Sequence, residues 1–193
     1  MTGKTFPDLR SRLAARSPRR VSPSVGQREA AVALILGPDD RGAGHILFIK
    51  RAEFTGDPWS GQIAFPGGRR DPADPDLQHT AMREALEETG ISLAPDTLAG
   101  ALDDLSPVSP HLPQIIVRPF VFELEGLPPV KPSAEVALHL WVSRDVLQSS
   151  RTSETLLLLG QPRLVSGYRV GPHFIWGMTE RILTPLLDLL DQR

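Results

Sequence analysis

Two apolar runs of strand length, at 30–36 and 45–49, follow each other closely in the first third of the chain. Short apolar runs bounded by turn residues are typical of buried strands, so we predict a strand pair. The segment between them, 37–44, is rich in glycine but lacks the Gly-Lys-Ser/Thr ending that a phosphate-binding loop needs before a helix. We therefore interpret it as a turn.

A helix is the next prominent element. A short strand predicted at 61–65 runs into 66–68, Pro-Gly-Gly, which we expect to interrupt regular structure. The helix after it is predicted to have Asp74 as its N-cap, a proline in its first position and Asp76 in its first turn. It should end at Gly90.

The remaining apolar runs predict five more strands and two more helices. The strands are expected at 98–105, 115–124, 137–142, 155–159 and 168–170, and the helices at 6–16 and 178–190. The last helix carries a stripe predicted to be core or the seam of a homodimer, formed by Ile182, Leu183, Leu186, Leu187 and Leu190. The main domain should then cover 28–193, after an N-terminal helix and linker at 1–27.

Composition narrows the class of protein. A chain of 193 residues with 40% hydrophobic and 23% charged residues fits one globular domain. A net charge of -2 argues against a nucleic-acid partner and favours a small molecule. No apolar run reaches the ~18 residues of a membrane span, and no secretory signal precedes the domain. We expect a cytoplasmic protein, although the arginine-rich start has a faint likeness to a mitochondrial transit peptide; a short solvated helix is favoured.

Candidate chemistry lies on the helix before Gly90. At about 100° per residue, Glu84, Glu87 and Glu88 share one face, and Leu86 lies among the apolar residues of an opposite, buried face. Like charges at i and i+4 cost a helix ~0.2–0.5 kcal/mol per pair. The cluster is either a solvated surface or a site for a hard cation such as Mg²⁺. Because there are no cysteines, any metal must be held by oxygen or histidine.

The segment 83–91, Arg-Glu-Ala-Leu-Glu-Glu-Thr-Gly-Ile, resembles the second half of the Nudix hydrolase signature, Arg-Glu-aliphatic-any-Glu-Glu-any-Gly-aliphatic. The first half is looser, because Asp74 stands for a glutamate and is displaced by one residue. The resemblance extends over 28–142, less securely to the C-terminus. It implies an α/β/α sandwich with a mixed sheet and a hydrolase acting on phosphorus anhydrides.

The resemblance also implies a metal site. Glu84, Glu87 and Glu88 would bind Mg²⁺, or alternatively Mn²⁺, the carbonyl of Gly67 would complete the site, and Arg83 would orient a carboxylate. A metal that bridges phosphate oxygens and activates a water permits in-line attack on phosphorus.

A further carboxylate is expected from a loop before a late strand, since the family often places one there. Glu135, six residues before Trp141, occupies that place. It is either a metal ligand or general base, or a surface residue at the start of a strand.

The segments 61–68 and 176–179 resemble the coenzyme A diphosphatase branch, so coenzyme A or acyl-coenzyme A is the first substrate candidate. Asp57 and Trp59 stand where that branch has an arginine and a histidine, which puts this substrate in doubt. Trp59 either stacks on a nucleobase or packs beneath its turn.

Several residues outside the helix are candidate substrate contacts, namely Arg51, Phe65, Arg69 and His111, with Arg70 as a further phosphate contact. The arginines could equally be solvated surface residues, and His111 could be structural. Other nucleotide substrates stay open: NADH, ADP-ribose, a nucleotide sugar or a nucleoside triphosphate. A non-catalytic nucleotide-sensing module is the rival function, and an enzyme acting on RNA ends would require a basic face.

Overall fold

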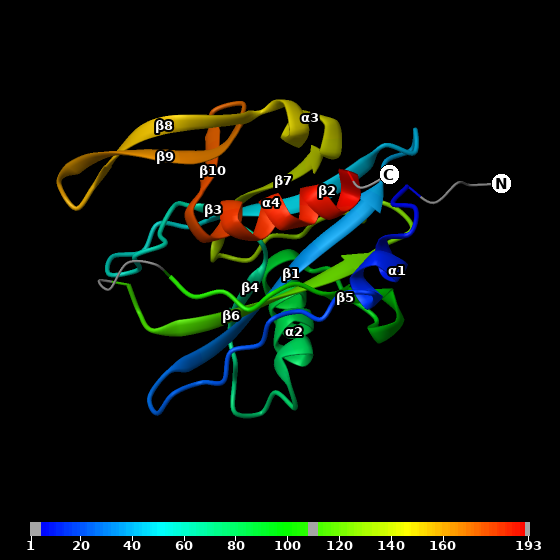
Figure 1. Cartoon of the computed structure of the whole chain (residues 1–193), viewed down its shortest axis with the longest axis horizontal. Coiled ribbons are helices and arrows are strands. Elements are labelled where there is room, and N and C mark those ends of the chain that lie inside the picture. The colour runs from blue at the N-terminus through cyan, green and yellow to red at the C-terminus, as the bar shows by residue number, and fades with distance from the viewer. Residues whose placement is uncertain (1–4, 108–111, 192–193) are drawn as a thin grey trace.

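A seven-stranded mixed sheet forms the centre of the computed structural model, which describes residues 5–107 and 112–191 (Figure 1). The longest strand, β1 (Arg28–Pro38), runs parallel to β6 (Ile115–Glu123) on one side. On its other side it pairs antiparallel with β2 (Gly44–Arg51) near its end and with β4 (Gly67–Arg69) near its start. The predicted strand pair is therefore confirmed.

The other strands complete this sheet and form a second one. The first sheet has the order β3-β2-β1-β6-β5, with β3 (Ile63–Ala64) and β5 (Leu98–Ala101) at its ends and β7 (Val136–Ser143) paired to β2. The second sheet has the order β10-β9-β8 and contains β8 (Arg151–Leu158), β9 (Gln161–Val170) and β10 (His173–Trp176). A 3-10 turn (Pro95–Thr97) precedes β5, and α3 (Arg144–Ser149) precedes β8.

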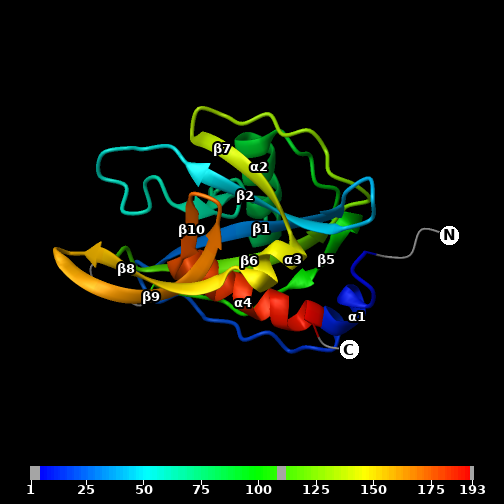
Figure 2. The same cartoon turned by 90° about the horizontal axis from the view of Figure 1, so that it is seen from above.

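Helices cover both faces of the central sheet (Figure 2). Successive side chains of a strand point to opposite faces, and β1 uses both. Ala33 and Ile35 pack in the cluster under α2 (Leu77–Thr89), whereas Leu34 and Leu36 pack in the cluster with α1 (Leu9–Ala14) and α4 (Gly177–Asp191). The result is the expected α/β/α sandwich.

The C-terminal helix stripe is buried, with Leu183 and Leu186 fully inaccessible, so within this chain it is core. The N-terminal helix is shorter than predicted and is not simply a solvated helix. Phe6, Leu9 and Leu13 are buried in the same core. None of the helices within 5–107 and 112–191 is long and apolar enough to span a membrane.

The predicted interruption at 66–68 is shorter than expected: β3 ends at Ala64 and β4 begins at Gly67, so the break falls at 65–66. Gly67 and Gly68 belong to β4 and pair with Val32 and Ala31. Glycine permits this pairing because a Cβ on Gly67 would overlap the backbone of β1 at Ala31 and Val32. The segment is thus a short strand held unusually close to β1.

Candidate active site

Helix α2 begins two residues later than the sequence predicts. Its N-cap is Asp76, whose carboxylate accepts a hydrogen bond from the backbone N–H of His79 at 2.9 Å. Gly90 ends the helix as predicted, in a left-handed conformation with φ 71°. The assignment of Asp74 as the cap is wrong, because its side chain is committed to an arginine further along the helix.

Asp74 and Arg83 form the ion pair that anchors the helix to the loop before it. Arg83 donates from Nε and Nη2 to the two carboxylate oxygens of Asp74 at 3.1 and 3.0 Å, and Thr80 donates to Asp74 at 2.9 Å. The hydrogen bonds from Arg83 lower the pKa of Asp74 to about 2, although burial acts to raise it. Asp74 is therefore ionised at neutral pH.

The same arginine contacts two of the candidate metal ligands. Its Nη1 lies 2.9 Å from a carboxylate oxygen of Glu84 and 3.0 Å from one of Glu87. Arg83 is thus placed between Asp74 on the loop and the glutamates of the helix, so it fixes the direction of the Glu84 side chain.

The exposed and buried faces of α2 differ from the prediction. Glu88 is only 3% exposed because it shares the inner face with Ala81 and Ala85, and Leu86 is 50% exposed because it lies on the far side of the helix. The expectation that Leu86 is buried is wrong. One glutamate of the cluster consequently points inward, beside the sheet.

Glu88 is buried without a direct ion-pair partner among the described residues, although the charge of Arg51 acts to lower its pKa. Its carboxylate accepts a hydrogen bond from the backbone N–H of Gly67 at 2.8 Å, and it forms no ion pair with any described residue. Burial raises its pKa to about 7, with the nearby Glu84 carboxylate adding to the effect. Burial likewise raises the pKa of Glu84, and Glu87 and Glu135 act in the same direction.

These carboxylates have the chemistry of a divalent-cation site, because hard oxygen donors with unbalanced negative charge are what Mg²⁺ binds. Gly68 supports this fit: a Cβ there would overlap the Glu84 carboxylate, so the glycine leaves the space that the side chain fills. As placed, however, no three acidic or histidine side chains within 5–107 and 112–191 converge closely enough to ligate one ion. Binding would require their side chains to turn together.

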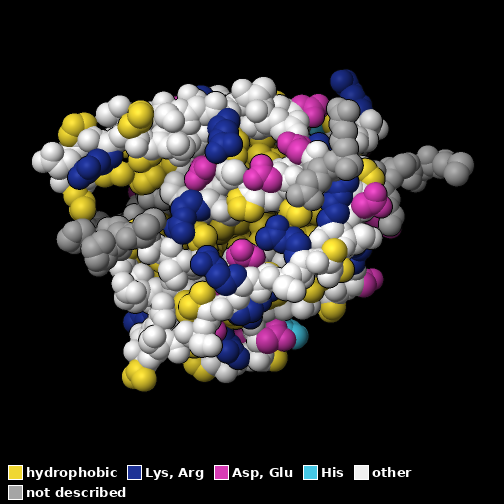
Figure 3. All heavy atoms as spheres, in the orientation of Figure 1, with side chains coloured by type: hydrophobic (Ala, Val, Ile, Leu, Met, Phe, Trp, Pro, Cys, Tyr) yellow, Lys and Arg dark blue, Asp and Glu magenta, His cyan; other side chains and the backbone are white. Residues whose placement is uncertain are grey.

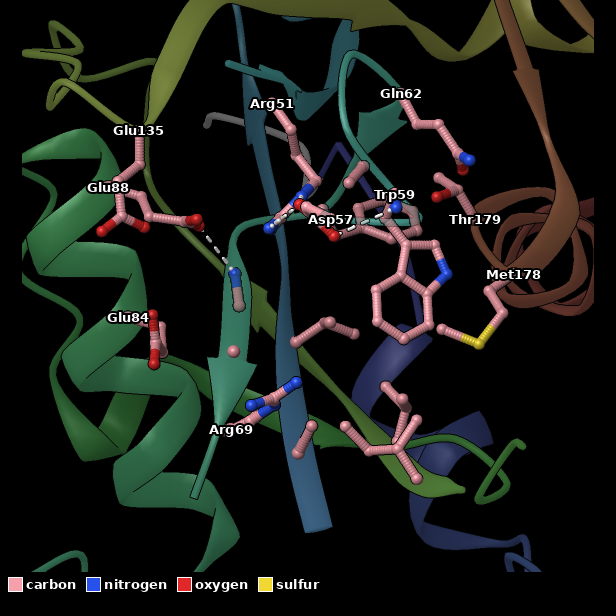
Figure 4. Close-up of a pocket in the computed structure, with 18 of the residues that line it drawn as sticks. Arg51, Asp57, Trp59, Gln62, Arg69, Glu84, Glu88, Glu135, Met178 and Thr179 are labelled. Carbon is pink, nitrogen blue, oxygen red and sulfur yellow. Dashed lines mark hydrogen bonds and ion pairs between the residues drawn. The ribbon is translucent and has the colours of Figure 1, made fainter. Parts of the chain in front are cut away.

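A cavity of about 670 Å³ joins the glutamates to an apolar wall (Figure 4). Glu84, Glu88 and Glu135 line one end, and Gly67 lies beside them. Trp59 and Met178 lie toward the other end, and Phe65 and Ile182 are further apolar residues of the lining. Such a combination of polar groups and apolar wall is typical of a small-molecule site.

The cavity brings together most of the candidate residues. Arg51, Phe65, Arg69, Arg70 and Glu135 all line it. Glu87 does not; its side chain is 58% exposed and faces Arg83. His111 lies outside the described residues.

Two features of the cavity were missed by the sequence reasoning. Asp57 does not merely remove positive charge, since its carboxylate pairs with Arg51 at 2.8 Å and accepts a hydrogen bond from the backbone N–H of Trp59 at 3.0 Å. The start of α4 also lines the cavity through Met178 and Thr179, and Thr179 donates to the carbonyl of Ile63 at 3.0 Å. The segment 176–179 was already noted for its resemblance to the coenzyme A diphosphatase branch. The sequence did not predict that this segment lies against the cavity.

The surrounding surface is mixed in charge. On the face that Figure 3 shows, basic and acidic side chains alternate with apolar ones, without a continuous basic patch. This face therefore lacks the electrostatic footprint of a protein that binds a phosphate backbone.

Comparison with known proteins gives consistent similarities. Residues 26–157 match the family model described as NUDIX domain. The chain is 31% identical over 174 residues to Nudix hydrolase 22, chloroplastic, of Arabidopsis thaliana, covering 86% of this chain and 56% of that protein. It is 28% identical over 153 residues to mitochondrial coenzyme A diphosphatase NUDT8 of Homo sapiens, covering 78% of this chain and 64% of that protein. The chain thus spans less than two thirds of the length of either relative.

A solved structure supports the fold. The MutT/nudix family protein from Enterococcus faecalis superposes with a TM-score of 0.62 and 16% identity, covering 88% of this chain and 66% of that one. At this identity the likeness concerns the arrangement of helices and strands alone.

Proposed function

Because the chain belongs to the Nudix hydrolase family, we propose that it hydrolyses the diphosphate linkage of a nucleoside diphosphate derivative, with Mg²⁺ or Mn²⁺ as cofactor. The observation that carries the proposal is the buried Glu88 without a cation partner, at the end of a cavity that also holds Arg69 and an apolar wall. The acidic end suits a metal, Arg69 suits a phosphate, and the wall suits the organic part of a substrate.

The metal ligands in this proposal are Glu84, Glu87 and Glu88, with the Gly67 carbonyl. A divalent ion held there would neutralise phosphate charge and acidify a water molecule. Arg83 holds Glu84 in place, and the Gly67 N–H holds Glu88. Both contacts orient their carboxylate in the absence of a metal.

The reaction would add one water across a P–O–P bond. The water oxygen attacks one phosphorus in line, and the bond between that phosphorus and the bridging oxygen breaks. The other phosphate leaves with the bridging oxygen. Glu135, at the acidic end of the cavity, would accept the proton of the attacking water. Arg69 would contact a non-bridging phosphate oxygen.

Coenzyme A or acyl-coenzyme A is the first substrate candidate, supported by the 28% identity to a coenzyme A diphosphatase and by the segments 61–68 and 176–179. NADH, ADP-ribose, a nucleotide sugar and a nucleoside triphosphate are the alternatives. A nucleotide-sensing module without catalysis is the rival, and it is disfavoured because Glu84, Glu87 and Glu88 are intact. For location, the cytoplasm stays our proposal.

The test is hydrolysis of a panel with and without Mg²⁺: coenzyme A, NADH, ADP-ribose, UDP-glucose and a nucleoside triphosphate. We expect Mg²⁺-dependent cleavage of at least one member. Glu88→Gln should reduce its kcat/KM by more than the roughly 10–100-fold that is usual for a group supporting a ligand. Glu154→Gln, on β8 and outside the cavity lining, is the control for the lost charge. Absence of cleavage for every member would favour the sensing module.

A further inference from the structure

Most of the arginines that line the cavity are already held by carboxylates. Four arginines and five acidic residues line it: Arg51, Arg69, Arg70, Arg83, Asp57, Asp71, Glu84, Glu88 and Glu135. Arg83 is bound to Asp74 and to two glutamates of α2, and Arg70 is paired with Glu29 at 3.3 Å. Three of the four arginines are thus committed to carboxylates, since Arg51 is held by Asp57.

Arg69 is the exception among the described residues. It lines the cavity and its side chain forms no ion pair within 5–107 and 112–191. The cavity consequently offers an anionic ligand one uncompensated guanidinium, in addition to any metal at the glutamates. This charge matches a diphosphate, but leaves no cation for a further phosphate group.

The Arg51–Asp57 pair lies between the two ends of the cavity. Figure 4 shows it between the glutamates of α2 and the ring of Trp59. Arg51 donates from Nη2 and Nε to the same Asp57 oxygen at 2.8 and 3.3 Å, and the other oxygen accepts from the Trp59 N–H. The Asp57 carboxylate therefore neutralises the charge of Arg51 and also holds the loop that carries Trp59.

We infer that Asp57 is a specificity-determining positioning residue, which makes the cavity select diphosphates without an additional phosphomonoester. The inference rests on the proposed function and narrows its substrate class: it places dephospho-coenzyme A, NADH and ADP-ribose ahead of coenzyme A and acyl-coenzyme A, which carry a phosphomonoester. A phosphomonoester carries up to two further negative charges. Asp57 adds negative charge to the cavity wall, and a phosphomonoester could bind Arg51 only by breaking an existing ion pair.

Two pairs of compounds test the inference, because the members of each pair differ by one phosphomonoester: NADH with NADPH, and dephospho-coenzyme A with coenzyme A. We expect kcat/KM of the wild-type protein to be about five- to tenfold higher for the member without the additional phosphate. The difference should lie in KM, because Asp57 acts on binding and does not touch the reacting atoms.

The variant Asp57→Asn tests the charge of Asp57 separately from its hydrogen bond. The amide oxygen can still accept the hydrogen bond from the backbone N–H of Trp59, whereas the ion pair with Arg51 is lost. We expect kcat/KM to rise about fivefold for the phosphorylated member and to change by less than about twofold for the other. Glu154→Gln removes the same charge from β8 and should leave the preference unchanged.

Each outcome distinguishes the two proposals. If no compound is hydrolysed, the proposed function fails. If compounds are hydrolysed but the wild-type protein treats both members of each pair alike, or prefers the phosphorylated one, the inference about Asp57 is overturned. An equal change for both members in Asp57→Asn also overturns it. The wild-type ratio decides the matter even if the variant does not fold.

Discussion

At the scale of single residues, the α2 glutamates that line the cavity come from one contiguous motif, whereas the contacts that support them do not. The segment 83–91 identified Glu84 and Glu88, which both line the cavity. The prediction that Asp74 is the N-cap was wrong. Asp74 and Asp76 are both suitable N-cap residues, and only the folded backbone determines which of them caps the helix. The contact from Asp74 to Arg83 spans nine residues and follows no local pattern.

Asp57 illustrates the same limit. In the sequence, Asp57 is recognisable only as a negative charge in a loop. Its distance of 2.8 Å to Arg51 shows that it compensates the charge of that arginine. Arg51 is the last residue of β2, and Asp57 lies six positions later in an irregular loop, so their separation in sequence does not determine the distance between their side chains. Pairings of this kind therefore require coordinates.

Glu135 gives the prediction that belongs to this scale. It lies on the cavity wall beside Glu84 and Glu88, and its charge raises the pKa of both. If it accepts the proton of the attacking water, Glu135→Gln should lower kcat at saturating Mg²⁺ by about 100-fold or more, the usual contribution of a general base. Turnover over a Mg²⁺ titration separates loss of the base from loss of metal affinity.

Glu125→Gln is the matched control for this substitution, since Glu125 is exposed and does not line the cavity. Nearly full turnover by Glu135→Gln at saturating Mg²⁺ would show that Glu135 is only a surface residue at the start of β7.

At the scale of elements, the long apolar runs were predictable and the short or exposed elements were not. The strands β1, β2 and β6 are rows of buried apolar residues, so composition alone marks them. The helix α3 and the strand β10 were not predicted because each is brief. The strands β8 and β9 extend beyond their predicted bounds because most of their side chains face solvent and lack a buried stripe.

The strand β4 shows why Pro-Gly-Gly is ambiguous in sequence. The same glycines that disfavour regular structure in isolation allow a backbone to approach another closely. Here the approach is to β1 on one side and to Glu84 on the other. The requirement for glycine thus comes from neighbours that are distant in sequence.

Gly68→Ala is the corresponding prediction. The added methyl group would overlap the end of the Glu84 side chain, which can rotate away, so we expect the free energy of unfolding to change by less than about 1 kcal/mol. Displacing a metal ligand should nevertheless reduce kcat/KM and apparent Mg²⁺ affinity roughly 10–100-fold. Urea unfolding and a Mg²⁺ titration measure the two effects separately.

Gly126→Ala is the control, because a Cβ there would meet no atom within 4 Å. Activity of Gly68→Ala equal to that of Gly126→Ala would mean that the position of the Glu84 carboxylate does not limit the reaction.

At the scale of the whole molecule, the α/β/α layers could be predicted from the sequence. The attachment of the segment 17–26 to the sheet could not. A linker was expected at 17–26, and the structure ties it to the sheet through Asp104. This carboxylate, fully buried, accepts hydrogen bonds from Arg118 at 2.8 Å, from Arg20 at 3.1 Å and from the Val21 N–H at 2.9 Å. We therefore propose that residues 5–27 are an integral part of the domain.

Asp104→Asn tests this tie. Removing one partner of a buried ion pair leaves Arg118 uncompensated, so the free energy of unfolding should fall by about 3 kcal/mol at pH 7. Asp191→Asn is the control, since Asp191 pairs with Arg144 at an exposed position and should cost less than about 1 kcal/mol. A loss no larger than that of the control would mean that the first residues are only loosely attached.

The pH dependence has a definite sign. Burial acts to raise the pKa of Asp104, but the hydrogen bonds from Arg118 and Val21 outweigh it and lower the pKa below its ordinary value. A lowered folded-state pKa contributes stability that is complete above the unfolded pKa, near 4, and is lost as the pH falls through the folded pKa. The stability difference between wild type and Asp104→Asn should therefore shrink below about pH 4.

The parallel pairing of β1 with β6 has a consequence for synthesis of the chain. Residue 28 is paired with residue 115 and residue 36 with residue 123, and four strands and α2 lie between them in sequence. A nascent chain therefore exposes one edge of the long apolar strand β1 until β6 has left the ribosome. Pairing of strands so distant in sequence is slow, so we expect β1 to be prone to aggregation during that interval.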